Sequence, residues 1–355
     1  MPYRVVQWST GNVGRLALKA IIEHPDLELA GLLVHSEAKA GKDAGELAGS
    51  APTGVVATTD VDEVLALGAD CVSYTATGDL RPDDAISDMV RILESGANVV
   101  STAVVPLVYP PTAPARYTDR LEAACAAGGT SCFTSGIDPG FANDLIPLAF
   151  LGTCQRVESV RIMEVLDYST YEQPEVLFDT MGFGSSLDST PLILLPGVLS
   201  LAWGGTVGIL AAGLGVEVEE LREVHQRVPA PRTYDLGFGT IEEGTQAGLR
   251  FEIQGIVDGR PRIIVEHVTR IGDEDEVAPD WPHLPGGGGY RIEIAGNPNI
   301  QCDFHMEGAA GDHNDAGLLM TAMRCLNAIP AVCAAAPGVL SALDLPLVTG
   351  TGSMR

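Results

Sequence analysis

Apolar runs of strand length alternate with amphipathic stretches over the first part of the chain. The apolar runs cover 4–9, 27–36, 54–59, 69–77, 98–105 and 130–135. Apolar positions at helical spacing between these runs predict helices over 12–24, 60–67, 82–95 and 112–127. Strands that alternate with helices in this way are typical of a doubly wound parallel sheet, so the predicted fold class is α/β.

The pattern changes beyond this first domain, where longer apolar-polar alternations follow one another without helices. They read RVESVRIMEVLDYS, GLRFEIQGIVDG, PRIIVEHVTRI, GYRIEIAG and NIQCDFHMEG. Consecutive strands of this kind predict an α+β domain with an open mixed or antiparallel sheet. The tail returns to helical spacing, with breaks at Pro330 and Pro337. We predict domains over 1–137 and 138–308, and a helical segment over 309–355 that packs back on the first domain.

The acidic composition argues against two classes of binding partner. The 355-residue chain has a formal net charge of −26, which argues against nucleic acid and anionic membrane surfaces as partners. Its seven cysteines form no C-x-x-C pair, and no export signal is visible ahead of the first apolar run. We therefore expect reduced thiols and a cytoplasmic protein.

One uncharged stretch, 189–216, is long enough to span a membrane. Prolines and glycines interrupt this stretch, and acidic residues flank both of its ends. It also lies mid-chain between amphipathic strands, which a lone span would separate. We expect a buried helix or a helix at a subunit interface, and no membrane partner.

The motif Ser9-Thr10-Gly11-Asn12-Val13-Gly14 lies where the first strand gives way to the first helix. It keeps the second and third glycines of the G-x-G-x-x-G fingerprint, which allow the backbone to approach a pyrophosphate and the helix to pack on the strand. Ser9 replaces only the turn glycine. Because backbone amides at a helix start attract anions, we predict a nicotinamide dinucleotide here. The other interpretation is a Rossmann-like domain without a ligand.

The end of the second strand bears on the choice between NADP and NAD. Neither Asp nor Glu follows Val34 directly, and Glu37 comes one or two places late for a ribose 2′-hydroxyl. His35, Ser36 and Lys39 could contact a 2′-phosphate, which favours NADP and leaves NAD open, although a solvated loop fits the same residues. Further cofactor contacts are expected at the ends of the fourth and fifth strands, where small residues stand: Thr75, Ala76, Thr77, Thr102 and Ala103.

Four segments together resemble a known family. They read VVQWSTGNVG, AGKDAGEL, GIDPGFANDLIP and DHNDAGLLMTAMRCLNAIPAVC. The chain resembles the dihydrodipicolinate reductase-like family that includes 2,4-diaminopentanoate dehydrogenase and the NAD(P)H-dependent amine dehydrogenases. The resemblance implies an N-terminal Rossmann domain and a C-terminal α+β domain whose open sheet shapes the substrate pocket and a homodimer. It also implies hydride transfer between the nicotinamide and a small substrate at the domain cleft.

The amine dehydrogenases that the chain resembles place a glutamate just after the fifth strand, where it holds and deprotonates the amine. This chain reads Thr102-Ala103-Val104-Val105-Pro106-Leu107 there. A cationic amine needs a nearby carboxylate. We therefore expect an NAD(P)H-dependent oxidoreductase that acts on a small imine or amine, or on a carbonyl compound or alcohol. The alternative is a catalytically silent NAD(P)-binding sensor or regulatory protein.

Candidate catalytic residues follow from strand alternation and from the crossing between domains. His267 is polar on an otherwise apolar strand face, which suits either a core histidine or a proton donor. Tyr168 is either a core tyrosine or a hydroxyl donor at the pocket wall. Asp138 in GIDPG is the nearest substitute carboxylate, together with Asp144, which could equally cap a helix. Candidate substrate contacts are Phe141, Asn143, Asp144, Tyr171 and His305.

The segment QCDFHMEG offers possible metal ligands. Asp303, His305 and Glu307 alternate on one strand face and are residue types that bind metals. The intervening residues are apolar, so a polar row facing solvent or the cleft explains the pattern equally well. We predict no metal site.

Overall fold

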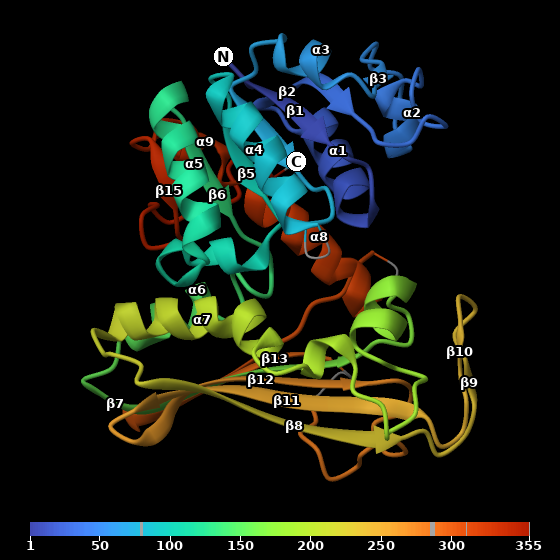
Figure 1. The fold of residues 1–355 in the computed structure, drawn as a ribbon, viewed down its shortest axis with the longest axis vertical. Helices are drawn as coiled ribbons and strands as arrows, with labels where there is room; N and C mark the ends of the chain where they lie inside the picture. Colours follow the sequence, from blue (N-terminus) through green and yellow to red (C-terminus); the bar gives the residue numbers. More distant parts are fainter. Residues whose placement is uncertain (79–80, 285–287, 310, 355) are drawn as a thin grey trace. The chain divides into compact units, whose positions relative to one another are not determined.

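The computed structural model describes residues 1–78, 81–284, 288–309 and 311–354. The described residues form two compact units, Met1–Phe141 together with Leu318–Arg355, and Ala142–Gly317 (Figure 1). The second unit is therefore an insertion into the first along the chain. The sequence patterns placed the corresponding boundaries after residues 137 and 308.

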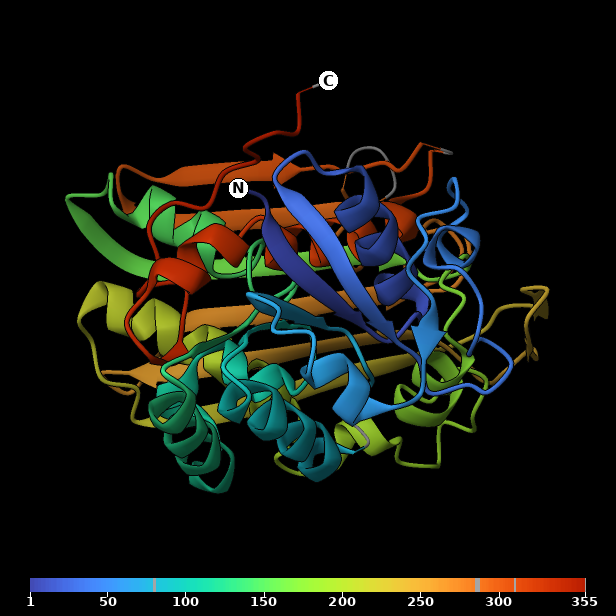
Figure 2. The same ribbon diagram turned by 90° about the horizontal axis from the view of Figure 1, so that it is seen from above.

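A parallel sheet forms the centre of the first unit. Among the described residues it has seven strands in the order β15-β6-β5-β4-β1-β2-β3, and neighbouring strands are parallel. β1 and β2 run side by side, as the blue arrows of Figure 2 show. The strands are β1 (Tyr3–Trp8), β2 (Leu27–Leu33), β3 (Ala57–Thr58), β4 (Cys71–Tyr74), β5 (Asn98–Ser101), β6 (Ser131–Thr134) and β15 (Gly338–Leu340). The predicted α/β class with a Rossmann-type parallel sheet is confirmed.

Helices cover both faces of this sheet (Figure 1). α4 and α5 pack against one face, and α1, α9 and the second half of α8 pack against the other. Burial of these apolar stripes is what holds the layers together. The helices are α1 (Asn12–Glu23), α2 (Ala44–Ala48), α3 (Val61–Leu65), α4 (Pro82–Glu94), α5 (Ala115–Gly128), α8 (His313–Leu326) and α9 (Ile329–Ala334).

By length and composition, the stretch His313–Ala334 could cross a membrane. In the described structure, however, Cys325, Ile329 and Val332 from this stretch are buried in the core of the first unit. Core helices of soluble proteins pass the same composition test, so the stretch is weak evidence for a span.

The fifth strand is shorter than predicted. β5 ends at Ser101, Val104 takes a left-handed conformation with φ +60°, and the chain continues as the 3-10 helices η1 (Val105–Val108) and η2 (Pro110–Thr112). The prediction of a strand over 98–105 is therefore wrong in its last four residues. Valines favour strands, but Pro106 has no N–H for a sheet and suits the first turn of a helix.

A mixed sheet forms the second unit. Its described strands follow the order β14-β13-β7-β12-β11-β8, with β7 and β12 parallel and the other neighbours antiparallel. The predicted mixed sheet is confirmed, although the sequence patterns missed β8. The strands are β7 (Arg156–Asp167), β8 (Glu220–Pro229), β11 (Gln246–Val257), β12 (Arg260–Arg270), β13 (Gly289–Asn297) and β14 (Ile300–Phe304), with a separate hairpin of β9 (Tyr234–Asp235) and β10 (Thr240–Ile241).

Most of the uncharged stretch forms α7 (Val198–Leu214), which lies across one face of this sheet (Figure 1). Leu199, Val207 and Leu210 are buried in the core between helix and sheet. α7 approaches β11 closely, since a Cβ on Gly255 would lie 2.5 Å from Cγ1 of Val207. We call this the helix-covered face. The remaining helical segments of the unit are α6 (Leu145–Leu151), the π-helix η3 (Glu175–Thr180) and the 3-10 helix η4 (Leu192–Leu194).

Candidate functional site

The turn between β1 and α1 has the backbone shape of a phosphate-binding loop. Ser9 has φ +79°, so it adopts the left-handed conformation that the missing first glycine would take. For a residue other than glycine this conformation costs about 1–2 kcal/mol. Ser9 therefore makes the same turn at a modest cost in stability.

The two remaining glycines of the motif have different surroundings. A Cβ on Gly14 would lie 2.5 Å from the carbonyl oxygen of Ser9 and 2.6 Å from Oγ1 of Thr75. A Cβ on Gly11 would meet no described atom within 4 Å. Gly14 thus allows α1 to pack on the strand ends, while Gly11 leaves the open side of the turn free for a close ligand. These are the roles that a dinucleotide fingerprint requires.

A buried glutamine that the sequence analysis missed holds this turn in shape. Gln7 Nε2 donates hydrogen bonds to the Ser9 carbonyl at 2.9 Å and to Thr75 Oγ1 at 2.7 Å. The Thr75 hydroxyl in turn donates to the Trp8 carbonyl at 3.0 Å. Thr75, predicted as a cofactor contact, therefore braces the turn. Asn12 and Val13 form the first turn of α1.

A lysine lies beside the same turn. Lys39 Nζ donates to the carbonyl oxygen and to Oγ1 of Thr10, each at 3.0 Å. His35 and Ser36, at the end of β2, are exposed. The structure thus brings Lys39, but neither of the other two, into contact with the motif.

The ends of β4 and β5 present small side chains, as predicted. Ala76 and Ala103 are buried, Thr102 is half-buried and Thr77 is exposed. Beyond them, Val104 and Leu107 are buried in the core of the first unit. The described loop after β5 therefore supplies apolar packing and no carboxylate.

The second unit carries a buried carboxylate on its helix-covered face. Glu164 on β7 is 5% exposed and lies directly opposite His267 on β12 and Tyr290 on β13 in the strand registers. His267 Nδ1 is 3.2 Å from Glu164 Oε1, to which the Tyr168 hydroxyl also donates at 3.2 Å. The Tyr290 hydroxyl donates to Glu164 Oε2 at 2.6 Å. Two predicted residues, His267 and Tyr168, thus meet at a third that was not predicted.

Aromatic rings surround this cluster. The His267 ring stacks on Phe251 with centroids 4.7 Å apart and contacts Trp203 of α7 at 4.6 Å. Tyr168 stacks on Tyr171 at 4.4 Å. A carboxylate among π faces is an environment that favours a cation. We call Glu164, Tyr168, His267 and Tyr290 the carboxylate cluster.

The sequence contained a signal for Glu164. Side chains at every second position of β7 share one face, and Val160, Ile162 and Leu166 are apolar there. Glu164 is the charged exception, as His267 is the polar exception on β12. The same argument that selected His267 would have found it.

Asn143, Asp144 and His305 have other surroundings in the described structure. Asn143 is fully buried, and its amide has no hydrogen-bond partner among the described residues. Asp144 accepts a hydrogen bond from the Leu145 amide at the start of α6, as a helix cap does. His305 Nδ1 lies 2.9 Å from the Gly288 carbonyl oxygen. Phe141 ends the first segment of the first unit, and Asp138 lies just before it along the chain.

One of the three residues considered as metal ligands, Asp303, forms an ion pair within the protein. Arg291 binds both carboxylate oxygens of Asp303, at 2.7 and 2.8 Å. The hydrogen bond from Arg291 holds the pKa of Asp303 below its ordinary value. Asp303 thus has a cationic partner from the protein itself.

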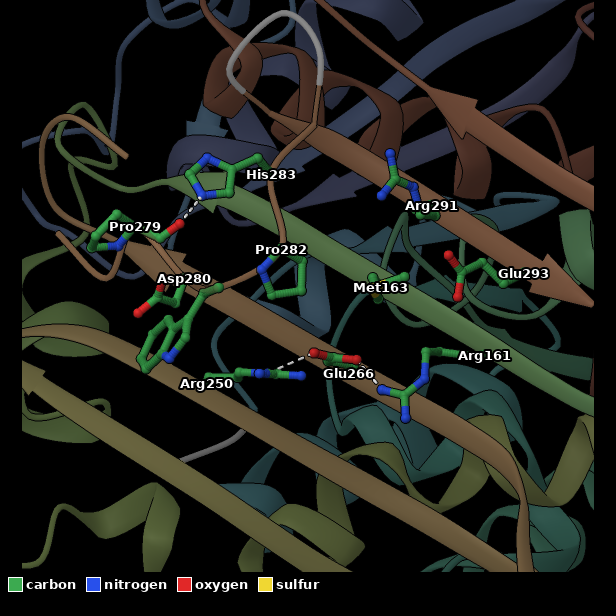
Figure 3. Close-up of a pocket in the computed structure, with 11 residues that line it drawn as sticks. Arg161, Met163, Arg250, Glu266, Pro279, Asp280, Pro282, His283, Arg291 and Glu293 are labelled. Carbon is green, nitrogen blue, oxygen red and sulfur yellow. Dashed lines mark hydrogen bonds and ion pairs between the residues drawn. The ribbon is translucent and has the colours of Figure 1, made fainter. Parts of the chain in front are cut away.

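The opposite face of the second sheet carries a charged pocket of about 560 Å³ (Figure 3). Glu266 lies between two arginines there: Arg250 Nε donates to its Oε1 at 2.7 Å, and Arg161 contacts its Oε2. Arg161 also donates to Glu252 at 2.8 Å. The Glu266 side chain is only 1% exposed. We call this surface, with its alternating arginines and glutamates, the charged face.

Comparison with known proteins finds a family match in each of the two units. Residues 141–354 match the family described as 2,4-diaminopentanoate dehydrogenase C-terminal domain, and residues 5–78 match the N-terminus of dihydrodipicolinate reductase. An amine dehydrogenase from Streptomyces virginiae is 43% identical over 354 residues, which are 98% of this chain and 98% of that protein. The chain belongs to the amine dehydrogenase family.

Two further members of this group extend the comparison. A 2,4-diaminopentanoate dehydrogenase from Acetoanaerobium sticklandii is 25% identical over 72% of this chain and 68% of its own length. The structure of an amine dehydrogenase from Mycobacterium smegmatis has a TM-score of 0.80, covering 98% of this chain and 97% of that one at 19% identity. The latter likeness shows the shared fold.

Family membership gives the activity in outline. The protein is an NAD(P)-dependent oxidoreductase of the amine dehydrogenase type, acting on a small molecule. The turn formed by Ser9, Gly11 and Gly14 fits a dinucleotide, because it leaves open space at Gly11 and close packing at Gly14. When bound, the nicotinamide accepts or donates a hydride.

Proposed function

We propose that the protein interconverts a small amine and the corresponding carbonyl compound plus ammonia, with NADP(H) as its preferred coenzyme. The carboxylate cluster carries the amine part of this proposal. A neutral carbonyl compound needs hydrogen-bond donors, whereas a cationic nitrogen needs negative charge in a site of low dielectric constant. Glu164 supplies that charge at 5% exposure.

The experiment follows NADPH oxidation with acetone, cyclohexanone or benzaldehyde, each with and without ammonium chloride. Turnover should require ammonium, because the cluster favours an iminium over a carbonyl group. Equal rates without ammonium would contradict amine chemistry in favour of carbonyl reduction. No turnover with any of the three, despite NADPH binding by fluorescence, would also contradict the proposal.

The coenzyme preference rests on Lys39. Its ammonium group is fixed beside Thr10 by two hydrogen bonds of 3.0 Å. Lys39 belongs to the loop that follows β2, the strand after which NAD-specific proteins place an acidic residue. A positive charge held there would pair with a 2′-phosphate. Residues His35 and Ser36 are exposed and offer additional donors.

Replacing Lys39 by alanine should raise the KM for NADPH by about tenfold or more, since a hydrogen bond to a charged group contributes about 1.5–3 kcal/mol. The KM for NADH should stay within about twofold, because NADH has no 2′-phosphate. Lys42→Ala is the matched control: Lys42 lies in the same loop and pairs with Glu46, and both side chains are exposed. An equal rise for both coenzymes would contradict the assignment.

We also propose that the protein is a homodimer that associates through the charged face. Arginines and glutamates alternate on that face, so a second copy related by a twofold axis can place opposite charges together. Sedimentation should give twice the chain mass of 37.1 kDa, and Glu293→Arg at the pocket edge should weaken association. A monomeric wild-type protein at micromolar concentration would contradict the dimer.

A further inference from the structure

A fully buried carboxamide lies near the end of β1. Gln7 is 0% exposed and shares its face of the sheet with Val5, a residue of the hydrophobic core. Burying a carboxamide costs free energy unless its polar atoms are hydrogen-bonded, and Gln7 Oε1 has no hydrogen-bond partner among the described residues. The contacts that set this residue apart from an apolar one are therefore those of Nε2.

The Nε2 group of Gln7 points at the turn that follows β1. It donates to the Ser9 carbonyl oxygen at 2.9 Å and to Thr75 Oγ1 at 2.7 Å, and it lies 3.3 Å from the Trp8 carbonyl oxygen. Backbone carbonyl oxygens can only accept hydrogen bonds. The carboxamide must therefore present its NH₂ group, and not its oxygen, to the turn.

Ser9 is held in the left-handed conformation from both of its ends. Its N–H donates to the Leu33 carbonyl of β2 at 2.9 Å, and its carbonyl oxygen accepts from Gln7. Its φ of +79° is a conformation that glycine adopts freely and that serine adopts only at a cost. Without Gln7, the Ser9 carbonyl would lose the donor that keeps it pointing inward.

The direction of the Ser9 carbonyl also sets the direction of the next N–H group. The Ser9–Thr10 peptide bond is trans, and in a trans peptide the C=O and N–H bonds point to opposite sides. Because the Ser9 carbonyl points at buried Gln7, the Thr10 N–H points away from it. Backbone N–H groups at a strand-to-helix turn of this kind bind phosphate groups.

We infer that Gln7 is a positioning residue for the coenzyme. Through the Ser9 carbonyl it orients the Ser9–Thr10 peptide, which leaves the Thr10 N–H available to the pyrophosphate that NADPH and NADH share. A glycine would make the left-handed turn inexpensive, whereas Gln7 stabilises the same turn in serine. This role concerns coenzyme binding alone, so it holds whether the substrate is an amine or a carbonyl compound.

A glutamine that only fills space in the core would behave differently. Its replacement would lower the melting temperature, but the dissociation constants of a folded variant would stay unchanged. The residue at position 9 would then have no influence on the effect of the replacement. Coupling between positions 7 and 9 therefore separates the two roles.

The test replaces Gln7 by leucine in the full chain and follows binding of NADPH and NADH by fluorescence titration. Both dissociation constants should rise by about tenfold or more, because a hydrogen bond to a charged group is worth at least about one order of magnitude in affinity. The matched control is Ser73→Ala. Ser73 is 1% exposed and lies directly opposite Gln7 on β4, but its hydroxyl has no hydrogen-bond partner among the described residues, so both constants should stay within about twofold.

Ser9→Gly supplies the rescue. Alone, it should leave both dissociation constants within about threefold of the wild type, since glycine makes the same turn. In the Gln7→Leu background it should restore at least about fivefold in affinity, because it removes the cost of the left-handed serine. Gln7→Asn guards against a folding defect: it keeps the carboxamide but is too short to reach the turn, so it should bind both coenzymes as weakly as Gln7→Leu. If Gln7→Leu does not fold, the titrations of Gln7→Asn, with and without Ser9→Gly, decide.

Three results would overturn the inference: a folded variant at position 7 that binds both coenzymes within about twofold of the wild type, a loss confined to NADPH, or no rescue by Ser9→Gly. A wild-type protein that binds neither coenzyme would overturn it as well. The proposed function fails in other measurements, because neither an absent dependence on ammonium nor an absent preference for NADPH alters the comparison of these variants.

Discussion

Replacing Gly14 by alanine should remove measurable NADPH binding and lower the melting temperature. The added Cβ would lie 2.5 Å from the Ser9 carbonyl and 2.6 Å from Thr75 Oγ1, distances that backbone and a braced side chain cannot relieve by a small shift. Overpacking of this kind costs about 1–3 kcal/mol, and it would push α1 away from the strand end. Thermal unfolding and fluorescence titration with NADPH measure the two effects.

Gly11→Ala separates the two roles of the motif. A Cβ there meets no described atom within 4 Å, so the free energy of unfolding should change by less than about 1 kcal/mol. The methyl group would nevertheless occupy the side from which a pyrophosphate approaches the backbone. The dissociation constant for NADPH should rise at an unchanged melting temperature. Normal NADPH binding by Gly14→Ala would contradict the assignment of the turn.

Truncating Glu266 to alanine should lower the free energy of unfolding by about 3–5 kcal/mol. The 1% exposed side chain lies between Arg161 and Arg250, and its loss leaves two arginine charges poorly compensated. Urea unfolding followed by tryptophan fluorescence measures the change, since Trp203 and Trp281 lie in the same unit.

The control for this prediction is Glu220→Ala. Glu220 pairs with Arg222 at 3.4 Å, and both side chains are about half exposed. Exposed pairs of this kind contribute less than about 1 kcal/mol. If both variants lose the same stability, burial of the Glu266 ion pairs does not stabilise the sheet.

The parallel sheet could be predicted because its signal is local and repeated. Each strand of the first unit up to β6 is an apolar run beside a helical stretch, and the glycine motif marks one such junction. β15 (Gly338–Leu340) escaped this argument, because it lies in the tail, where the apolar positions have helical spacing. β8 escaped it because most of its side chains are exposed, so its alternation is weak.

The site was harder to predict, because it depends on registers between distant strands. The sequence identified His267 and Tyr168 one at a time, each as an unusual residue on its own strand. Only pairing of β7 with β12 and β13 shows that His267 and Tyr290 flank the same glutamate. The substitute carboxylates predicted from the sequence, Asp138 and Asp144, lie near the chain crossing, whereas Glu164 lies inside a strand.

The interrupted first unit has a consequence for synthesis of the protein. Gly338 in β15 pairs with Ser131 in β6, and all of Ala142–Gly317 is translated between them. The nascent dinucleotide-binding unit is thus begun first and finished last. Until α9 and β15 leave the ribosome, the β6 edge and apolar residues such as Cys71 and Phe133 lack their final cover. This interval is when the growing chain is most exposed to chaperones and to misassembly.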